Sequence, residues 1–496
     1  MHSWQRGSWT ARMLTLLPLR PAPKALNRIL LALLMGLLIA SPPTIEGPVR
    51  LLREGDLSHQ RGQYSRSLDY YREASKTRAL GAIPDVRAAK LQLTRRNQPV
   101  EEAMDYLERA GADEGVKQTV LGIMAFGRKD HVEARQYLAD ALKNRPFDGE
   151  ARYYLARSYL LSGDYDEAIR EFDRVLAAPA PALSRWREAA CYNLGLLHMV
   201  RGEQAAVEHL LEAAKGKVDA ELGKKALTLL SALETGGEDR QSEDPLALGV
   251  ALLAVGEARL ARVQFEKALD LTSRRAHTLA YLGYIHWLEG EHSRAGDLLE
   301  QSVRLQADSP IAHYFLGVLR RAQGRLADAL AEFQRVIAID PKSAPAYVEL
   351  GQTLILERDY SGAASAFERA VEIHPDNAGY VLRLAQFYLD HAIGLDRALV
   401  VARKAVELAP ESADALDALG WALWADGQAY DARHTLELAI ASNPDLARAH
   451  YHLAVLLERT GDAEAAAREF RRVIDLEPDG SYASRAEAAL LDHDSP

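Results

Sequence analysis

The histidines are the side chains in this sequence most able to bind a metal ion, and there are fifteen of them. Two pairs stand close enough along the chain to be considered as ligands, His286 with His292 and His450 with His452. Two ligands on one face of a helix need a spacing of three or four residues. These pairs are six and two residues apart, which is typical of ordinary surface or groove histidines. We therefore predict no metal site.

Nucleophilic and phosphate-binding motifs are absent from the sequence as well. Gly223-Lys224 is followed by Lys225, and no Gly-x-Ser-x-Gly, His-Glu-x-x-His or Cys-x-x-Cys motif occurs. The single cysteine, Cys191, excludes an internal disulfide and falls at a helix packing position, which predicts a buried, inert thiol. Carboxylate pairs such as Asp166-Glu167 have the pattern of a solvated helix face. We predict no catalytic site, no cofactor and no enzymatic activity.

The overall charge is acidic, with 60 Lys and Arg against 70 Asp and Glu, for a formal net charge of −10. Nucleic-acid binding depends on neutralising phosphates, so this balance argues against a nucleic-acid partner. The basic residues are unevenly placed. Residues 1–28 contain five of them and no acidic residue, because the first carboxylate is Glu46.

An unbroken apolar run of twelve residues, 29–40, follows this basic head and ends at Ser41-Pro42-Pro43. A basic flank, an apolar core and a polar end are typical of an export signal or a membrane anchor. Twelve residues fit a signal-peptide core, whereas a spanning helix needs about 20. Cleavage after Ala40 would place Leu38 where a small side chain is preferred, which favours a retained anchor without excluding cleavage. Either way, the bulk of the chain is expected on the extracytoplasmic side.

A period of 34 residues organises the rest of the chain. Seven units fill 242–480 without a gap, and one of them, 378–412, has 35 residues. Each unit repeats a Leu followed by Gly or Ala, a small Ala, an aromatic or Leu residue, and in most units a Pro, for example Leu316-Gly317, Ala329, Phe333 and Pro341. Apolar spacings of three and four predict two helices per unit. The small residue after the leucine lets the second helix approach, with the alanine twelve residues on expected opposite it.

This pattern resembles the tetratricopeptide repeat. The resemblance is strong over 242–480, good in three earlier units and weak in two more, which span 115–148, 149–182, 188–221, 48–81 and 82–114. It implies an all-α fold, a right-handed superhelical solenoid in which helical hairpins stack on one another.

Irregular segments divide the array. The expected organisation is a basic N-terminus with the export or anchor segment (1–47), a first block of about five units (48–234) with an extra helix (220–233), a linker or hinge (235–241), the seven units (242–480), and a capping helix and tail (481–496).

Positions 5, 9 and 12 of each unit form a second stripe on the first helix. By resemblance, this stripe lines the concave side of the array, where peptides bind. Its candidate binding residues are Tyr284, Trp287, Tyr314, Arg321, Gln352, Gln386, Trp421, Trp424 and Tyr451. The Lys and Asn residues with which chaperone-binding relatives clamp a carboxylate are lacking here. We therefore expect a protein or peptide partner with an apolar or amphipathic segment.

An alternative for these side chains is burial between neighbouring first helices. For the whole chain, we expect an exported or membrane-tethered scaffold, anchored through residues 29–40, that helps assemble or regulate a cell-envelope machine such as a secretion, pilus or polysaccharide system. A cytoplasmic adaptor or co-chaperone that starts at Met13 or Met35 is the alternative, since a start at Met35 would abolish the export signal. An enzyme would need a catalytic domain, and no unassigned stretch approaches that size. The oligomeric state stays open.

Overall fold

The protein is built from helices joined by short turns, with no strand among the residues whose structure is described. The computed structural model describes residues 46–60, 64–76, 83–94, 104, 107–108, 111–178, 184–203, 205–216, 219–234, 244–270 and 275–493. The basic head and the apolar run at 29–40 lie outside this part of the chain. Within it, no helix combines the length and the apolar character needed to cross a bilayer.

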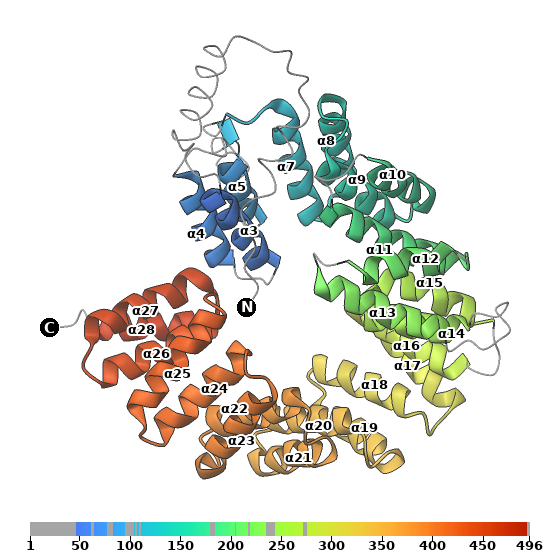
Figure 1. The fold of residues 1–496 in the computed structure, drawn as a ribbon. Coiled ribbons are helices and arrows are strands. Elements are labelled where there is room, and N and C mark those ends of the chain that lie inside the picture. The colour runs from blue at the N-terminus through green and yellow to red at the C-terminus, as the bar shows by residue number, and fades with distance from the viewer. Residues whose placement is uncertain are drawn as a thin grey trace, which may run out of the picture.

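The first part of the chain forms helical hairpins followed by one single helix (Figure 1). The helices are α3 (Glu46–Gln60), α4 (Tyr64–Ser75), α5 (Ile83–Thr94), α7 (Glu114–Gly127), α8 (His131–Asn144), α9 (Gly149–Ser162), α10 (Tyr165–Ala177), α11 (Ser184–Arg201), α12 (Ala205–Ala214) and α13 (Ala220–Glu234). Helix α13 has no hairpin partner and packs between α12 and α14.

Seven further hairpins and a final helix complete the array. They are α14 (Pro245–Ala254), α15 (Ala258–Ala268), α16 (Arg275–Leu288), α17 (His292–Leu305), α18 (Pro310–Ala322), α19 (Leu326–Ile339), α20 (Ala344–Leu356), α21 (Tyr360–Ile373), α22 (Ala378–Asp390), α23 (Leu395–Leu408), α24 (Ala413–Ala425), α25 (Ala429–Ser442), α26 (Ala447–Arg459), α27 (Ala463–Leu476) and α28 (Ser481–His493).

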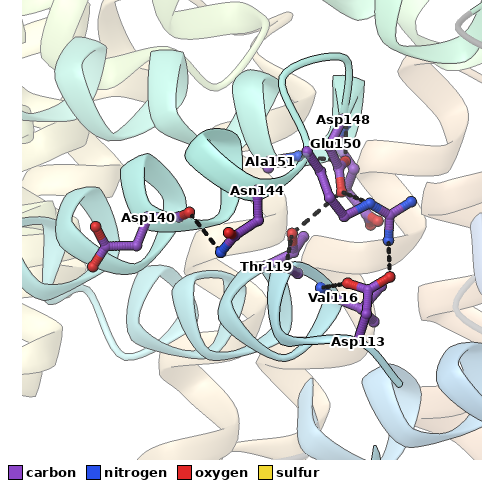
Figure 2. Close-up of polar contacts among 10 residues, drawn as sticks. Asp113, Val116, Thr119, Asp140, Asn144, Asp148, Glu150 and Ala151 are labelled. Atoms are coloured by element: carbon purple, nitrogen blue, oxygen red, sulfur yellow. Dashed lines mark hydrogen bonds and ion pairs between the residues drawn. The ribbon is translucent and has the colours of Figure 1, made fainter. Parts of the chain in front are cut away.

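Short polar side chains fix where first helices begin. Asp113 accepts a hydrogen bond from the Val116 amide at 2.9 Å, and Asp148 accepts two from amides of α9 at 3.1 Å (Figure 2). Thr119 of α7 donates to the second carboxylate oxygen of Asp148 at 3.3 Å. The cap of one hairpin is therefore tied to the first helix of the preceding one, in addition to the roughly 1 kcal/mol that such a cap contributes locally.

Glycine ends the first helix in most units, as predicted. Gly324 and Gly427 have φ angles of 73° and 81°, in the left-handed region that glycine adopts without a steric cost. Units without this glycine hold Lys129, Arg358 and Ala392 in the same region. The turn geometry is therefore imposed by the packing of the two helices, even where the residue does not favour it.

The tightest packing in a hairpin lies between the small residue of the first helix and a bulky residue of the second. A Cβ atom on Gly249 would lie 2.4 Å from Phe265 Cε1, and one on Gly317 would lie 2.7 Å from Phe333 Cε1. Both rings are fully buried. The nearest side chain opposite the glycine is thus sixteen positions on, and at Gly283 the alanine twelve positions on, Ala295, also lies close, with its carbonyl oxygen 3.2 Å from the added Cβ. An alanine has no side-chain reach, whereas an aromatic ring extends across the helix interface.

The hairpins stack into a curved array whose inner side is formed by first helices. Successive first helices, such as α16 with α18 and α22 with α24, contact each other more than successive second helices do. The array curves until its first and last helices come close to each other (Figure 1). Arg66 of α4 there donates to the Ala441 carbonyl of α25 at 3.0 Å. The predicted all-α superhelical solenoid is confirmed.

One apolar core continues from α11 to α16, on both sides of the expected linker at 235–241, which itself lies outside the described residues. Gln264 of α15 is almost fully buried and donates to the Val200 carbonyl at 3.0 Å, while Lys267 donates to the same oxygen at 2.7 Å. Cys191 belongs to this core, and burial raises the pKa of its thiol to about 11. The thiol therefore stays protonated and unreactive near neutral pH.

The contact between glycine and ring predicts opposite effects for two glycine-to-alanine changes. Gly249→Ala should lower the free energy of unfolding by about 1–3 kcal/mol, because the new methyl group meets a ring that cannot move. Gly296→Ala should raise it by about 0.5–1 kcal/mol, since its Cβ would lie in ordinary contact, 3.7 Å from Leu319 Cδ2, and alanine favours the helix. Urea unfolding followed by circular dichroism measures both. Equal effects of the two changes would contradict this account of the packing.

Candidate functional site

The nine candidate residues lie on first helices, and each is half-buried. They are placed on α16 (Tyr284, Trp287), α18 (Tyr314, Arg321), α20 (Gln352), α22 (Gln386), α24 (Trp421, Trp424) and α26 (Tyr451). The structure gathers them into an aromatic group at α16–α18 and a polar group at α22–α26, with a salt bridge and a hollow between. Trp424 belongs to neither group and packs against the core of the last hairpins.

The aromatic patch consists of Tyr281, Tyr284, Trp287, Tyr314 and Phe315. Tyr284 stacks on Trp287 with ring centroids 5.5 Å apart and on Phe315 at 4.4 Å. Phe315 in turn meets Tyr314 and Tyr281 edge-on, at 5.7 Å each. Burial raises the pKa of Tyr281 and of Tyr284, so both hydroxyls stay protonated and able to donate. Stacked rings of this kind form a rigid surface that loses little side-chain entropy when something binds to it.

The prediction based on positions 5, 9 and 12 did not include a further set of residues that contribute to the inner side of the array. They share position 6 of their units and are Tyr281, Phe315, Glu349, Arg383 and His452. Positions 2, 6 and 9 also follow helical spacing, and this spacing could have indicated the residues at position 6 from the sequence. In the structure, the ring at position 9 of one unit stacks on position 6 of the next, as Tyr284 does on Phe315.

A salt bridge borders the patch on the side of α20. Arg321 Nη1 donates to Gln352 Oε1 at 2.9 Å, and Arg321 Nη2 lies 2.5 Å from Glu349 Oε2. The second contact is out of line for a hydrogen bond, so this buried Glu349 oxygen has no hydrogen-bond donor. Tyr314 donates weakly to the other Glu349 oxygen, at 3.4 Å. The charge of Arg321 is therefore already matched within the chain by Glu349.

A hollow of about 230 Å³ opens beside this salt bridge, between α18, α20 and α22. It is lined by Tyr314, Pro345, Val348, Glu349, Gly379, Tyr380 and Arg383. Small-molecule sites usually measure 300–1,000 Å³, so the hollow is better suited to one side chain of a peptide. Its lining combines apolar walls with one carboxylate and one guanidinium group.

The polar group is centred on Asp417, which is 1% exposed. Arg448 Nε donates to Asp417 Oδ2 at 2.7 Å, and His452 Nδ1 lies 2.7 Å from the other oxygen. With its amide oriented by this contact, Gln386 places its oxygen 3.0 Å from Arg448 Nη2. Trp421 covers the group by stacking on His452 at 4.3 Å. Three successive hairpins are thereby joined across the inner side.

The charge state of Asp417 follows from these contacts. Burial alone would raise its pKa, but the charges and hydrogen bonds of His452 and Arg448 outweigh burial and lower the pKa below the ordinary value. The carboxylate is therefore ionised and fully paired, which makes this group a structural connection between hairpins. Tyr451, next to it, packs against Phe470 and Tyr482 at 5.9 and 5.1 Å.

The histidine pairs considered in the sequence do not come together as ligand pairs. His286 is buried while His292 is exposed. His452 contacts Asp417, whereas His450 lies between Glu469 Oε2 at 2.6 Å and the Pro444 carbonyl at 3.0 Å.

Comparison with known proteins identifies the family. Sequence profiles described as Tetratricopeptide repeat match residues 125–191, 246–310, 292–344, 344–377 and 417–481, which together cover just over half of the chain. The chain therefore belongs to the tetratricopeptide repeat family, and the predicted repeats are confirmed.

Curated relatives are distant. Mouse Superkiller complex protein 3 is 24% identical over 262 residues, which cover 51% of this chain and 15% of that protein. The human mitochondrial import receptor subunit TOM70 is 21% identical over 263 residues, covering 52% of this chain and 40% of that protein. The chain thus matches less than half the length of either. Among solved structures, the Cut9–Hcn1 hetero-tetramer of the APC/C is 12% identical with a TM-score of 0.43, covering 90% of this chain and 98% of that one.

Removing the buried carboxylate should cost far more than removing an exposed one that contacts the same arginine. Asp417→Ala leaves Arg448 and His452 without their common partner and should lower the free energy of unfolding by about 3–5 kcal/mol. Asp414 also accepts from Arg448, at 2.9 Å, but its side chain is 53% exposed. Asp414→Ala should therefore cost less than about 1 kcal/mol. Urea unfolding of both variants tests this, and similar losses would show that burial of the pair is unimportant.

Stability should also depend on the protonation of His313, which precedes Tyr314 in α18 and faces α19. Its Nδ1 is 2.6 Å from Glu332 Oε2 and its Nε2 is 3.0 Å from the Ala307 carbonyl, so both nitrogens face acceptors. The hydrogen bond to Glu332 raises the pKa of His313 although burial acts to lower it. Because the folded-state pKa is above the ordinary value of 6.5, the stabilisation is complete below that pH and is lost as pH rises through the folded-state pKa.

Melting temperatures measured at a series of pH values from 6 upward test this expectation. The series starts at pH 6 because the ordinary histidine pKa is about 6.5. His313→Gln should reduce the fall in stability with rising pH. The exposed His434 provides a control, and His434→Gln should leave the profile unchanged. A wild-type profile retained in His313→Gln would contradict the assignment.

Proposed function

We propose that this protein is a scaffold that binds a segment of another protein along the inner side of its superhelix, with the aromatic patch as the principal contact. The observation that carries the proposal is the run of stacked, half-buried rings on α16 and α18. Binding energy at protein interfaces is concentrated in a few such aromatic residues, held rigid before the partner arrives.

The surroundings of the patch define the partner further. The hollow beside it suits one apolar or aromatic side chain. Arg321 and Gln352 are already paired with each other, so they are poor clamps for a carboxylate. These features favour an amphipathic helix or an extended apolar peptide.

The cellular setting is part of the proposal. The basic residues of 1–28 and the apolar run 29–40 support an exported or membrane-tethered scaffold that serves a cell-envelope assembly. The human relative is named as an import receptor subunit, and holding a segment of another protein suits such a name. Recovery in the membrane or exported fraction, compared with a chain that starts at Met35, tests this setting. Recovery of the full chain in the cytoplasm would overturn it.

Site-specific photo-crosslinking tests the binding face. A photoreactive phenylalanine analogue replaces Tyr284 in the patch or, as control, Tyr430, which is 85% exposed on α25. The Tyr284 derivative should crosslink a partner in cells and the Tyr430 derivative should not. For that partner, Trp287→Ala should weaken binding by more than about 1 kcal/mol, with helicity unchanged. Equal binding by wild type, Trp287→Ala and Tyr430→Ala would remove the patch from the function.

A further inference from the structure

The turn between α16 and α17 brings together three side chains able to bind a metal ion. His286, Glu289 and Glu291 each place a ligand atom within 4.8 Å of the others, the only such group among the described residues. His286 Nδ1 lies 2.9 Å from Glu291 Oε2 and 3.7 Å from Glu289 Oε2. The three residues come from a single helix end and the turn after it, where Gly290 adopts a φ of 83°.

The nitrogen of this group is buried and has no hydrogen-bond partner. The His286 side chain is 4% exposed, and the nearby Glu291 oxygen is out of line with Nδ1, so no hydrogen bond joins them. A buried ring nitrogen without a partner costs free energy. A cation between the nitrogen and the two carboxylates would satisfy all three groups. Nitrogen with carboxylate oxygen is a donor set that zinc and its neighbours accept.

A second hairpin of the same chain shows what the site would be without its third ligand. In α11–α12, His198 and Glu203 occupy the same two positions of their unit as His286 and Glu291, and His198 Nδ1 is hydrogen-bonded to Glu203 Oε2. Arg201 occupies the same position of its unit as Glu289, which follows the end of α16, and lies 3.8 Å from Glu203. The α11–α12 hairpin thus combines a histidine with one carboxylate and one guanidinium group. The α16–α17 hairpin combines a histidine with two carboxylates.

Two arginines approach the acidic group without neutralising it. Arg262 of α15 donates to Glu289 Oε2 at 3.0 Å and also to Glu266 at 3.0 Å, while Arg294 lies 3.8 Å from Glu291. The three carboxylates of Glu266, Glu289 and Glu291 therefore share the two guanidinium groups of Arg262 and Arg294. Arg262 can keep Glu266 as its partner when a metal ion draws on Glu289, so its presence lowers the affinity for a cation but does not prevent binding.

We propose that His286, Glu289 and Glu291 form a binding site for a divalent transition-metal ion, with Zn²⁺ as the probe. The ion would join the end of α16 to the start of α17, and water would complete its coordination. The search for a second histidine at helical spacing missed the site because the other two ligands are carboxylates, one of which follows the turn. This site is independent of any partner on the inner side.

Zinc titration of the full chain, freed of metal by a chelator, tests the proposal. One equivalent of Zn²⁺ should bind in calorimetry and raise the melting temperature. His286→Gln should weaken zinc binding at least about tenfold. Removing a residue that only hydrogen-bonds to a metal ligand already lowers metal affinity by about that factor. Glu289→Arg should also remove binding, because it recreates the pattern of α11. Circular dichroism in the absence of metal confirms that these variants are folded.

His198→Gln is the matched control and should leave zinc binding unchanged. This control matters because His198 stacks on His209 at 5.3 Å, which makes that hairpin the competing location for a metal ion. No zinc binding by wild type, or unchanged binding by folded His286→Gln and Glu289→Arg, would overturn the proposal. Loss of binding in His198→Gln alone would overturn it too, by moving the ion to α11–α12.

Discussion

The close approach of the two helices in each hairpin is the contact on which the rest of this structure depends. It is made possible by a missing side chain, since a Cβ at Gly249 or Gly317 would overlap the ring of Phe265 or Phe333. Hairpins of the same shape then stack at the same angle, and this repeated rotation between neighbouring hairpins makes the array curve. Curvature brings the first helices to the inner side and finally returns α4 to α25, where Arg66 meets the Ala441 carbonyl.

A uniform backbone carries different chemistry along its inner side. The pairing of position 9 with position 6 of the next unit produces the Tyr284–Phe315 stack in one place and the Trp421–His452 stack in another. In the first, the neighbouring residues are aromatic and leave a half-buried patch. In the second, they are Asp417 and Arg448, whose charges neutralise each other. Burial of a charged pair joins hairpins, whereas partly exposed rings remain available to a partner, so the two groups serve different purposes despite equivalent positions.

Much of the fold follows from the residue pattern, and the site follows only in part. The 34-residue period, the helix-ending glycines and the all-α solenoid were predicted because they rest on spacings of three and four residues within one helix. The sequence did not show that the bulky residue sixteen positions on makes the nearest contact with the glycine, since position along the chain does not reveal how far a side chain reaches. Tyr281 and Phe315 were missed because two helical stripes, offset by a small rotation, were both compatible with the sequence, and only one was considered.

The sequence by itself determined the helices, their pairing into hairpins and the family, because each of these is encoded between residues less than one repeat apart. Tertiary structure decided which side chains meet across hairpins. Gln386 reaches Arg448 two units further on. His286 Nδ1 is left without a hydrogen-bond partner, although His198, in the same position of another unit, has one. Such contacts depend on the angle between neighbouring hairpins, which is set by the summed volumes of many packed side chains. A change of that angle by a few degrees moves a side chain in or out of contact, and no local pattern records it.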